Sequence, residues 1–104
     1  MAKAEITSGI CGFTTTVEAR MRGANCTLFI ESECKDVQRL AEELVEVDPF
    51  QEITFRGDGP RTLKAVARHC KHPACPVPSG IIKAIEVESG LALPADAHIR
   101  VARG

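Results

Sequence analysis

Apolar and polar residues alternate on both sides of one glycine, Gly23, and this pattern restricts the possible folds more than any other feature. From Cys11 to Met21 the odd-numbered positions are mostly apolar, and the even-numbered positions from Thr14 onward are polar. The alternation resumes over residues 26–33. A period of two is typical of a strand with one buried face. We therefore predict two antiparallel strands joined by a tight turn, in which Gly23 supplies the permissive backbone.

The turn also predicts the register of the two strands. If Gly23 and Ala24 form a two-residue loop, the facing pairs are Met21 with Cys26, Ala19 with Leu28, Val17 with Ile30, and Phe13 with Cys34. This register puts both apolar faces on the same side, whereas a slip of one residue would turn one of them to water. We expect Cys11 and Cys34 on the core-facing side at the open end of the hairpin, and Cys26 beside its turn.

Three later segments have the spacing of amphipathic helices. The first spans Val37–Val45, with apolar residues on one face, and should end or kink at Asp48-Pro49. The second begins near Pro60 and carries its apolar face from Leu63 to Cys70. The third opens at Pro78 or Ser79 and ends near Gly90, which is placed to act as a left-handed cap before Leu91.

A last strand is predicted near the C-terminus, where Ala97, Ile99 and Val101 alternate with polar residues. We expect it to pair with the first strand of the hairpin, because that edge is open. The sequence therefore predicts a single domain over residues 1–104 of the α+β class: a β-hairpin, three helices and a final strand. These form a three-stranded antiparallel sheet with helices on one face.

Composition excludes several function classes. Lys and Arg number 13 against 14 Asp and Glu, and the chain has four Phe but no Trp or Tyr. Such a chain offers neither a basic stripe nor a stacking platform, so we expect no nucleic-acid partner. No apolar run approaches the roughly 20 residues of a membrane span, and the start of the chain does not look like a signal sequence. We expect a cytoplasmic protein that does not bind membranes.

Five cysteines are the unusual feature of the composition. In a reducing cytoplasm they are poor candidates for disulfides. Cys11 and Met21, the predicted partner of Cys26, are separated by a strand of roughly 33 Å. Cys26 therefore cannot join a cluster built around Cys11, and we interpret it as a small buried apolar side chain.

The other four cysteines, Cys11, Cys34, Cys70 and Cys75, form our candidate metal site. Cys70 and Cys75 bracket a proline-containing connection that can present two sulfurs to one point. If this pair meets Cys11 and Cys34, the set suits zinc or an iron–sulfur cluster, both of which bind soft, deprotonated sulfur. His69 and His72 are possible additional ligands; the alternative is that they are solvated or cap the preceding helix.

Two other functions stay open at this point. One is a thiol redox protein that uses Cys34 or Cys75, although no Cys-x-x-Cys occurs and no base with an orienting partner is evident. The other is an interaction module for a protein partner, in which the cysteines are merely structural. The sequence thus does not by itself predict an enzyme.

Three segments resemble a family of small uncharacterised proteins from anaerobic bacteria and archaea: Ile10–Ala19, His69–Pro78 and Ile82–Val87. The likeness covers most of the chain and brings no established activity. It implies an anaerobic cytoplasm, and hence an oxygen-sensitive iron–sulfur cluster in preference to zinc.

Overall fold

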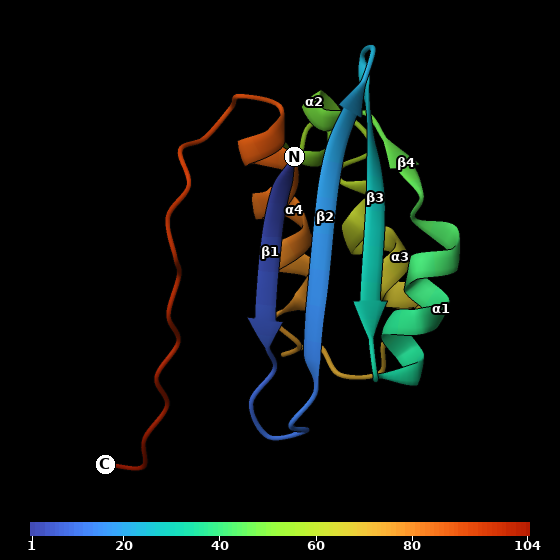
Figure 1. Ribbon diagram of the computed structural model, residues 1–104. Coiled ribbons are helices and arrows are strands. Elements are labelled where there is room, and N and C mark those ends of the chain that lie inside the picture. The colour runs from blue at the N-terminus through green and yellow to red at the C-terminus, as the bar shows by residue number, and fades with distance from the viewer.

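The computed structural model describes residues 1–104 as a four-stranded antiparallel sheet with helices packed on one face (Figure 1). The α+β class is as predicted, but the sheet has one strand more and the chain one helix more than expected. The strands, in sheet order, are β1 (Ala2–Thr7), β2 (Thr14–Arg22), β3 (Asn25–Ser32) and β4 (Glu46–Val47). The helices are α1 (Lys35–Glu43), α2 (Pro49–Glu52), α3 (Arg61–His69) and α4 (Val77–Glu88).

The predicted hairpin is confirmed as β2 and β3. Met21 faces Cys26, and the ladder continues in the predicted register to Thr15 opposite Ser32. Gly23 has a φ of 61°, a left-handed conformation that glycine adopts without strain. At the open end the ladder stops at the pair of Thr15 and Ser32, so the predicted pair of Phe13 with Cys34 does not form.

The third strand of the prediction was assigned to the wrong terminus. The open edge of β2 is occupied by β1, whose Ala2 faces Ala19 and whose Thr7 faces Thr14. Residues 97–101, predicted as the last strand, carry no regular structure. The N-terminal segment also alternates, with Ile6 buried and Glu5 exposed, and β1 needs only a short loop to reach β2.

The first helix ends two residues earlier than predicted, at Glu43, because the chain leaves it to pair with the sheet. Leu44 closes α1 by donating its N–H to the Leu40 carbonyl, and the Val45 carbonyl then accepts from Leu28 N–H at 2.8 Å. Val45, predicted to point inward, is consequently exposed. The next two residues form β4, and Asp48 caps the short helix α2 through its side chain.

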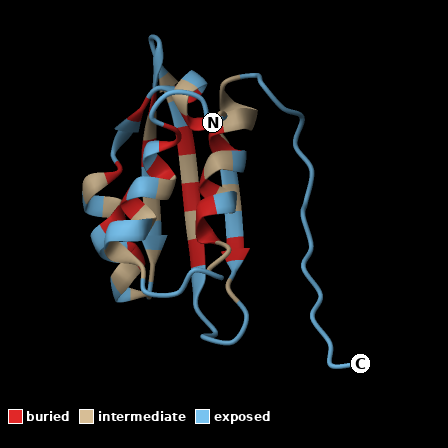
Figure 2. Cartoon of the chain, turned by 180° about the vertical axis from the view of Figure 1, so that it is seen from behind, coloured by how far each residue is buried: buried red, intermediate tan, exposed pale blue.

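A single layer of helices covers the inner face of the sheet, and the buried residues lie between the two layers (Figure 2). The helices contribute the largest fully buried side chains, including Leu40, Leu44, Ile81 and Ile85. Helix α4 lies over β1 and β2, so close that a Cβ on Gly80 would collide with Ile6. With 12 residues α4 is the longest helix, and none is long and apolar enough to cross a bilayer.

Candidate metal centre

Four of the five cysteines lie at one end of the sheet. This cysteine end comprises the loop of residues 8–13, the β3–α1 junction at residues 33–34, and the α3–α4 loop of residues 70–76. The β1–β2 and β2–β3 ladders both terminate there, with Thr7 opposite Thr14 and Thr15 opposite Ser32. Cys26 lies at the other end, next to the β2–β3 turn, and is fully buried. This separation of the four from the fifth agrees with the sequence analysis.

Cys34 is the residue that immediately precedes α1, and its backbone is held on both sides. Its N–H donates to Ser32 Oγ at 3.1 Å, and its carbonyl accepts from Gln38 N–H at 2.9 Å. The side chain is half-buried and packs against the edge of the hydrophobic core. The sulfur therefore starts from a fixed backbone while remaining accessible.

Cys70 and Cys75 flank the α3–α4 loop, which is tied to α1. Cys70 closes α3 by donating its N–H to the Val66 carbonyl at 2.8 Å, and Cys75 N–H donates to the His72 carbonyl at 3.2 Å. Between them, Lys71 N–H donates to Asp36 Oδ2 at 3.2 Å. Both thiols are half-buried against the core, as that of Cys34 is.

The electrostatics of Cys70 show that these three cysteines are neighbours. Burial, together with the nearby Cys75, Asp36 and Cys34, raises the pKa of the Cys70 thiol to about 11, while the Arg39 guanidinium opposes them. Cys70 is therefore a neutral thiol at pH 7 in the metal-free protein.

Cys11 differs from its prediction. It does not lie on a core-facing strand; it is exposed in a turn closed by Gly12 N–H donating to the Gly9 carbonyl at 2.9 Å. The reason is the unexpected strand β1, because a chain that passes from β1 to β2 must reverse in the residues before Thr14. Gly9 and Gly12, with φ of 90° and 73°, make that reversal possible.

The structure thus brings three of the predicted ligands together and leaves the fourth on the adjacent loop. No group of three or more Cys, His, Asp or Glu side chains is arranged closely enough to hold a metal ion as it stands. A metal centre at this end would require Cys11 and the half-buried thiols to move toward one another.

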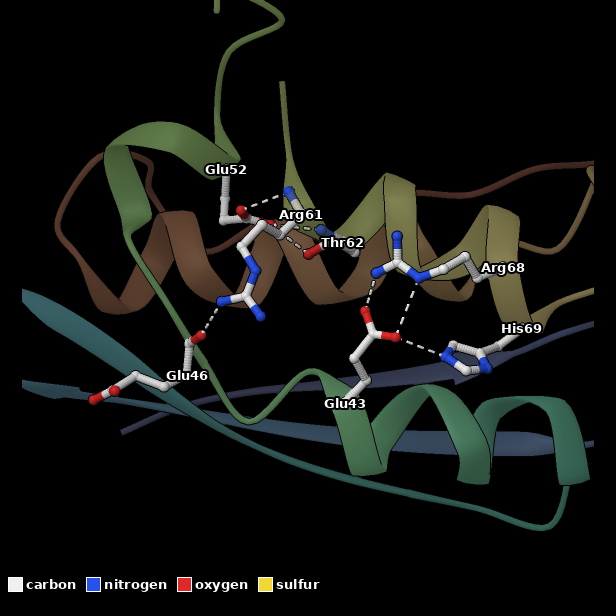
Figure 3. Close-up of polar contacts among 7 residues, drawn as sticks. All are labelled: Glu43, Glu46, Glu52, Arg61, Thr62, Arg68 and His69. Atoms are coloured by element: carbon white, nitrogen blue, oxygen red, sulfur yellow. Dashed lines mark hydrogen bonds and ion pairs between the residues drawn. The ribbon is translucent and has the colours of Figure 1, made fainter. Parts of the chain in front are cut away.

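The two histidines have different surroundings. His69 Nε2 lies 2.8 Å from Glu43 Oε1, and Arg68 binds the same carboxylate through its guanidinium (Figure 3). The hydrogen bond from Arg68, and then that from His69, lower the pKa of Glu43 to about 2. His72 is exposed in the α3–α4 loop. His69 is therefore already engaged by the side-chain carboxylate of Glu43 on α1, which is neither metal ligation nor the helix capping that the sequence suggested as the alternative.

The other end of α3 is anchored by Glu52, a buried carboxylate that the sequence analysis did not single out. It accepts from Arg61 N–H at 2.8 Å, Thr62 N–H at 2.9 Å and Thr62 Oγ1 at 2.6 Å (Figure 3). Arg61 in turn donates from Nη1 to the Glu46 carbonyl at 2.7 Å. The two ends of α3 therefore contact neighbouring segments, through the buried Glu52 at its start and the partly exposed Glu43 near Cys70 at its end.

An apolar cavity lies on the helical side of the molecule and contains none of the cysteines. Its lining comes from the segment after α2, from α3 and from α4, and includes Ile53, Phe55, Leu63 and Ile82. Because these residues come from three separate elements, no local pattern in the sequence marks the cavity.

Comparison with known families identifies the family of this chain but does not assign it a function. A model for a family of unknown function, DUF6951, matches residues 2–101. The chain belongs to this family. The predicted resemblance to an uncharacterised family is thereby confirmed, and the DUF6951 match contains all five cysteines and extends beyond α4. The anaerobic origin implied by the resemblance stays a prediction. Comparisons with curated proteins and with solved structures gave no significant match.

Proposed function

We propose that this DUF6951 protein binds a thiophilic metal centre, zinc or an iron–sulfur cluster, through Cys34, Cys70 and Cys75, with Cys11 as the fourth ligand. The single observation that carries the proposal is the grouping of three half-buried thiols from two separate chain segments, the β3–α1 junction and the α3–α4 loop. Residues used only for packing have no need to gather in this way. Soft thiolates in a set of four are the ligands that both centres prefer.

The backbone around the three clustered cysteines is ordered by hydrogen bonds. Each of the three clustered cysteines has its own amide satisfied, by Ser32, Val66 or His72, so the ligands do not start from a disordered chain. Charges of both signs lie near Cys70, since the Arg39 guanidinium lowers its pKa and the Asp36 carboxylate raises it. The Arg39 charge would offset part of the negative charge of a multiply ligated thiolate centre.

Cys11 is the ligand that must move the most. It belongs to a short exposed loop with two glycines. Ser8 N–H donates to the Phe13 carbonyl at the base of this loop, and Gly12 N–H donates to the Gly9 carbonyl at its turn. In this proposal the loop closes over the centre when metal binds, and binding releases the protons of the neutral thiols. The role of such a centre is electron transfer, sensing or structural support.

The test is metal analysis with an absorption spectrum on the full chain purified without oxygen. Wild type and Cys26→Ser should retain the same metal per chain, whereas Cys34→Ser and Cys75→Ser should bind at least about tenfold more weakly or not at all. Visible absorption that bleaches on reduction identifies an iron–sulfur cluster, and zinc without visible absorption identifies the alternative. Circular dichroism confirms that each variant is folded.

Two outcomes reject the proposal. If wild type binds neither added zinc nor a reconstituted cluster, and alkylation proceeds at similar rates at the accessible cysteines, the interaction module with structural cysteines replaces it. If one cysteine is alkylated much faster than the others in metal-free protein that binds no metal, the thiol redox alternative replaces it.

A further inference from the structure

Residues 91–104, the C-terminal tail, leave the body of the molecule as an exposed arm (Figure 2). Every residue of the tail is exposed, including the large apolar side chains of Leu93, Ile99 and Val101, at 88%, 79% and 91%. Ile99 and Val101 belong to the alternating segment that predicted a strand. A half-apolar strand pattern without a partner in its own chain indicates a segment that is covered by something else.

The end of α4 directs the tail away from its own sheet. Gly90 has a φ of 77°, Gly90 N–H donates to the Val87 carbonyl at 3.2 Å, and Leu91 N–H donates to the Glu86 carbonyl at 2.8 Å. This left-handed helix cap fixes the direction in which the chain emerges. The tail then runs alongside the molecule in the same direction as β1 but separated from it (Figure 1).

The outer edge of β1 has no partner strand. It is the first strand of the sheet, and β2 is its only neighbour. Outside that ladder, β1 makes one hydrogen bond, from Ala2 N–H to Glu88. The edge is six residues long and carries charges on its outward positions, Lys3 and Glu5. An open edge of this length is a template for an additional strand.

We propose that the tail of one chain pairs with β1 of a second copy, so that two copies form a dimer by exchanging C-terminal strands. Direction selects the second copy over the tail's own β1. Pairing within one chain would be parallel, in a sheet whose other pairs are all antiparallel. A two-fold axis between facing β1 edges reverses the partner, and the exchanged tail then enters as an antiparallel strand.

Side-chain chemistry selects the register. Ile99 belongs beside Ile6 and Val101 beside Ala4, which extends the helix-covered face of the sheet. The same register puts Arg100 beside Glu5 on the outer face, and residues 98–103 then match the six residues of β1. A shift of two residues toward the N-terminus of the tail would put Arg100 beside Lys3. Pro94, which cannot donate to a ladder, lies outside the paired segment.

Family membership supports a role for the tail within the domain. The DUF6951 model runs from residue 2 to residue 101 and so contains both β1 and the alternating segment. The inference does not rest on the proposed metal centre, because neither strand contains a cysteine.

The first experiment is sedimentation of the full chain under reducing conditions over a range of concentrations. Wild type should sediment as a dimer, and the double variant Ile99→Asp/Val101→Asp should dissociate at least about tenfold more readily. Leu93→Asp, which alters an equally exposed tail residue outside the paired segment, should behave as wild type. Glu5→Arg should weaken the dimer, and Glu5→Arg/Arg100→Glu should restore it. A monomeric wild type, or a dimer indifferent to the Ile99 and Val101 changes, overturns the proposal.

A disulfide experiment distinguishes exchange from return of the tail to its own chain. Chains carrying Glu5→Cys are mixed with chains carrying Arg100→Cys and oxidised, and a covalent heterodimer is expected. Wild type mixed with the Arg100→Cys chain measures the background from the native cysteines. A chain that carries both Glu5→Cys and Arg100→Cys is oxidised in parallel. If a cross-link forms only within this single chain and not between the mixed chains, the tail pairs with its own β1 and the exchange is wrong.

Discussion

The two ends of the sheet both contain cysteines, in different surroundings. At the hairpin end, Cys26 is fully buried on a strand, and burial together with the Glu88 charge raises its pKa. At the cysteine end, Cys34, Cys70 and Cys75 are half-buried at helix ends and in a loop. A cysteine that only packs is best placed inside a strand or helix, whereas a ligand is best placed where the backbone ends an element. The position of a cysteine in the fold therefore distinguishes one that only packs, Cys26, from those that are candidate ligands.

The largest effect is expected at the hairpin end, where Glu88 ties α4 to two strands. Its carboxylate accepts from Ala2 N–H at 2.8 Å and Met21 N–H at 2.9 Å. Glu88→Ala leaves both amides without this partner, so we expect a loss of about 2 to 3 kcal/mol in the free energy of unfolding. Urea denaturation measures it. Glu86→Ala on the same helix, whose side chain makes no hydrogen bond, is the control, and an equal loss in both variants would contradict the role of Glu88.

The same carboxylate predicts a pH dependence. The Met21 amide, and then the N-terminal ammonium, lower the pKa of Glu88 below its ordinary value of 4.5. Its contribution is therefore complete above that pH and is lost as the pH falls through the lower folded pKa. Glu88→Gln should reduce the loss of stability between neutral pH and acid, measured as urea midpoints across that range.

The third prediction compares the two kinds of cysteine directly. Cys26→Ser puts a hydroxyl into a fully buried site and should cost about 2 kcal/mol. Cys34→Ser, at a half-buried site, should cost less than about 1 kcal/mol in metal-free protein. Thermal unfolding with and without metal measures both. With metal present the order should reverse if Cys34 is a ligand, and an unchanged order would favour a packing role for both.

How far the sequence predicts the fold depends on whether a pattern is local. The β2–β3 register follows from one turn and two alternating strands, and the cap at Gly90 follows from a single glycine before Leu91. The choice of a third strand is not local. Both the N-terminal and the C-terminal segments alternate, and only the connection to β2 and the direction set by Gly90 decide between them.

The same distinction between local and non-local patterns applies to the candidate site. The positions of Cys34, Cys70 and Cys75 near helix boundaries were predictable because the sequence marks each boundary with periodicity or proline. Cys11 was misplaced as a core-facing residue because the strand pattern of β2 continues past the point where pairing stops. Glu52 was missed because its partners, Arg61 and Thr62, follow a loop whose path no local pattern determines.

A smaller effect should distinguish the loops at the two ends. Gly12 and Gly23 both have positive φ, and nothing lies within 4 Å of a Cβ added to either. Alanine at each position should therefore cost about 1 kcal/mol, from backbone strain alone. Only Gly12→Ala alters the turn that carries Cys11, so only this variant should also weaken metal binding. Equal metal affinities in a competition titration would mean that Cys11 is not a ligand.

The smallest effect is expected at Glu43, which compares directly with Glu88 because both carboxylates have a lowered pKa. Glu43 binds the side chains of Arg68 and His69 at a partly exposed position, whereas Glu88 binds backbone amides. Surface pairs between mobile side chains contribute little and are screened by salt. Glu43→Gln should lower the urea midpoint slightly at low ionic strength, and the difference should vanish near about 1 M salt. Carboxyl resonances should give a Glu43 midpoint of about 2, so its contribution disappears only as the pH falls from 4.5 toward that value. A loss as large as that of Glu88→Ala, or one that persists in salt, would show that this pair fixes α3 as firmly as Glu88 fixes α4.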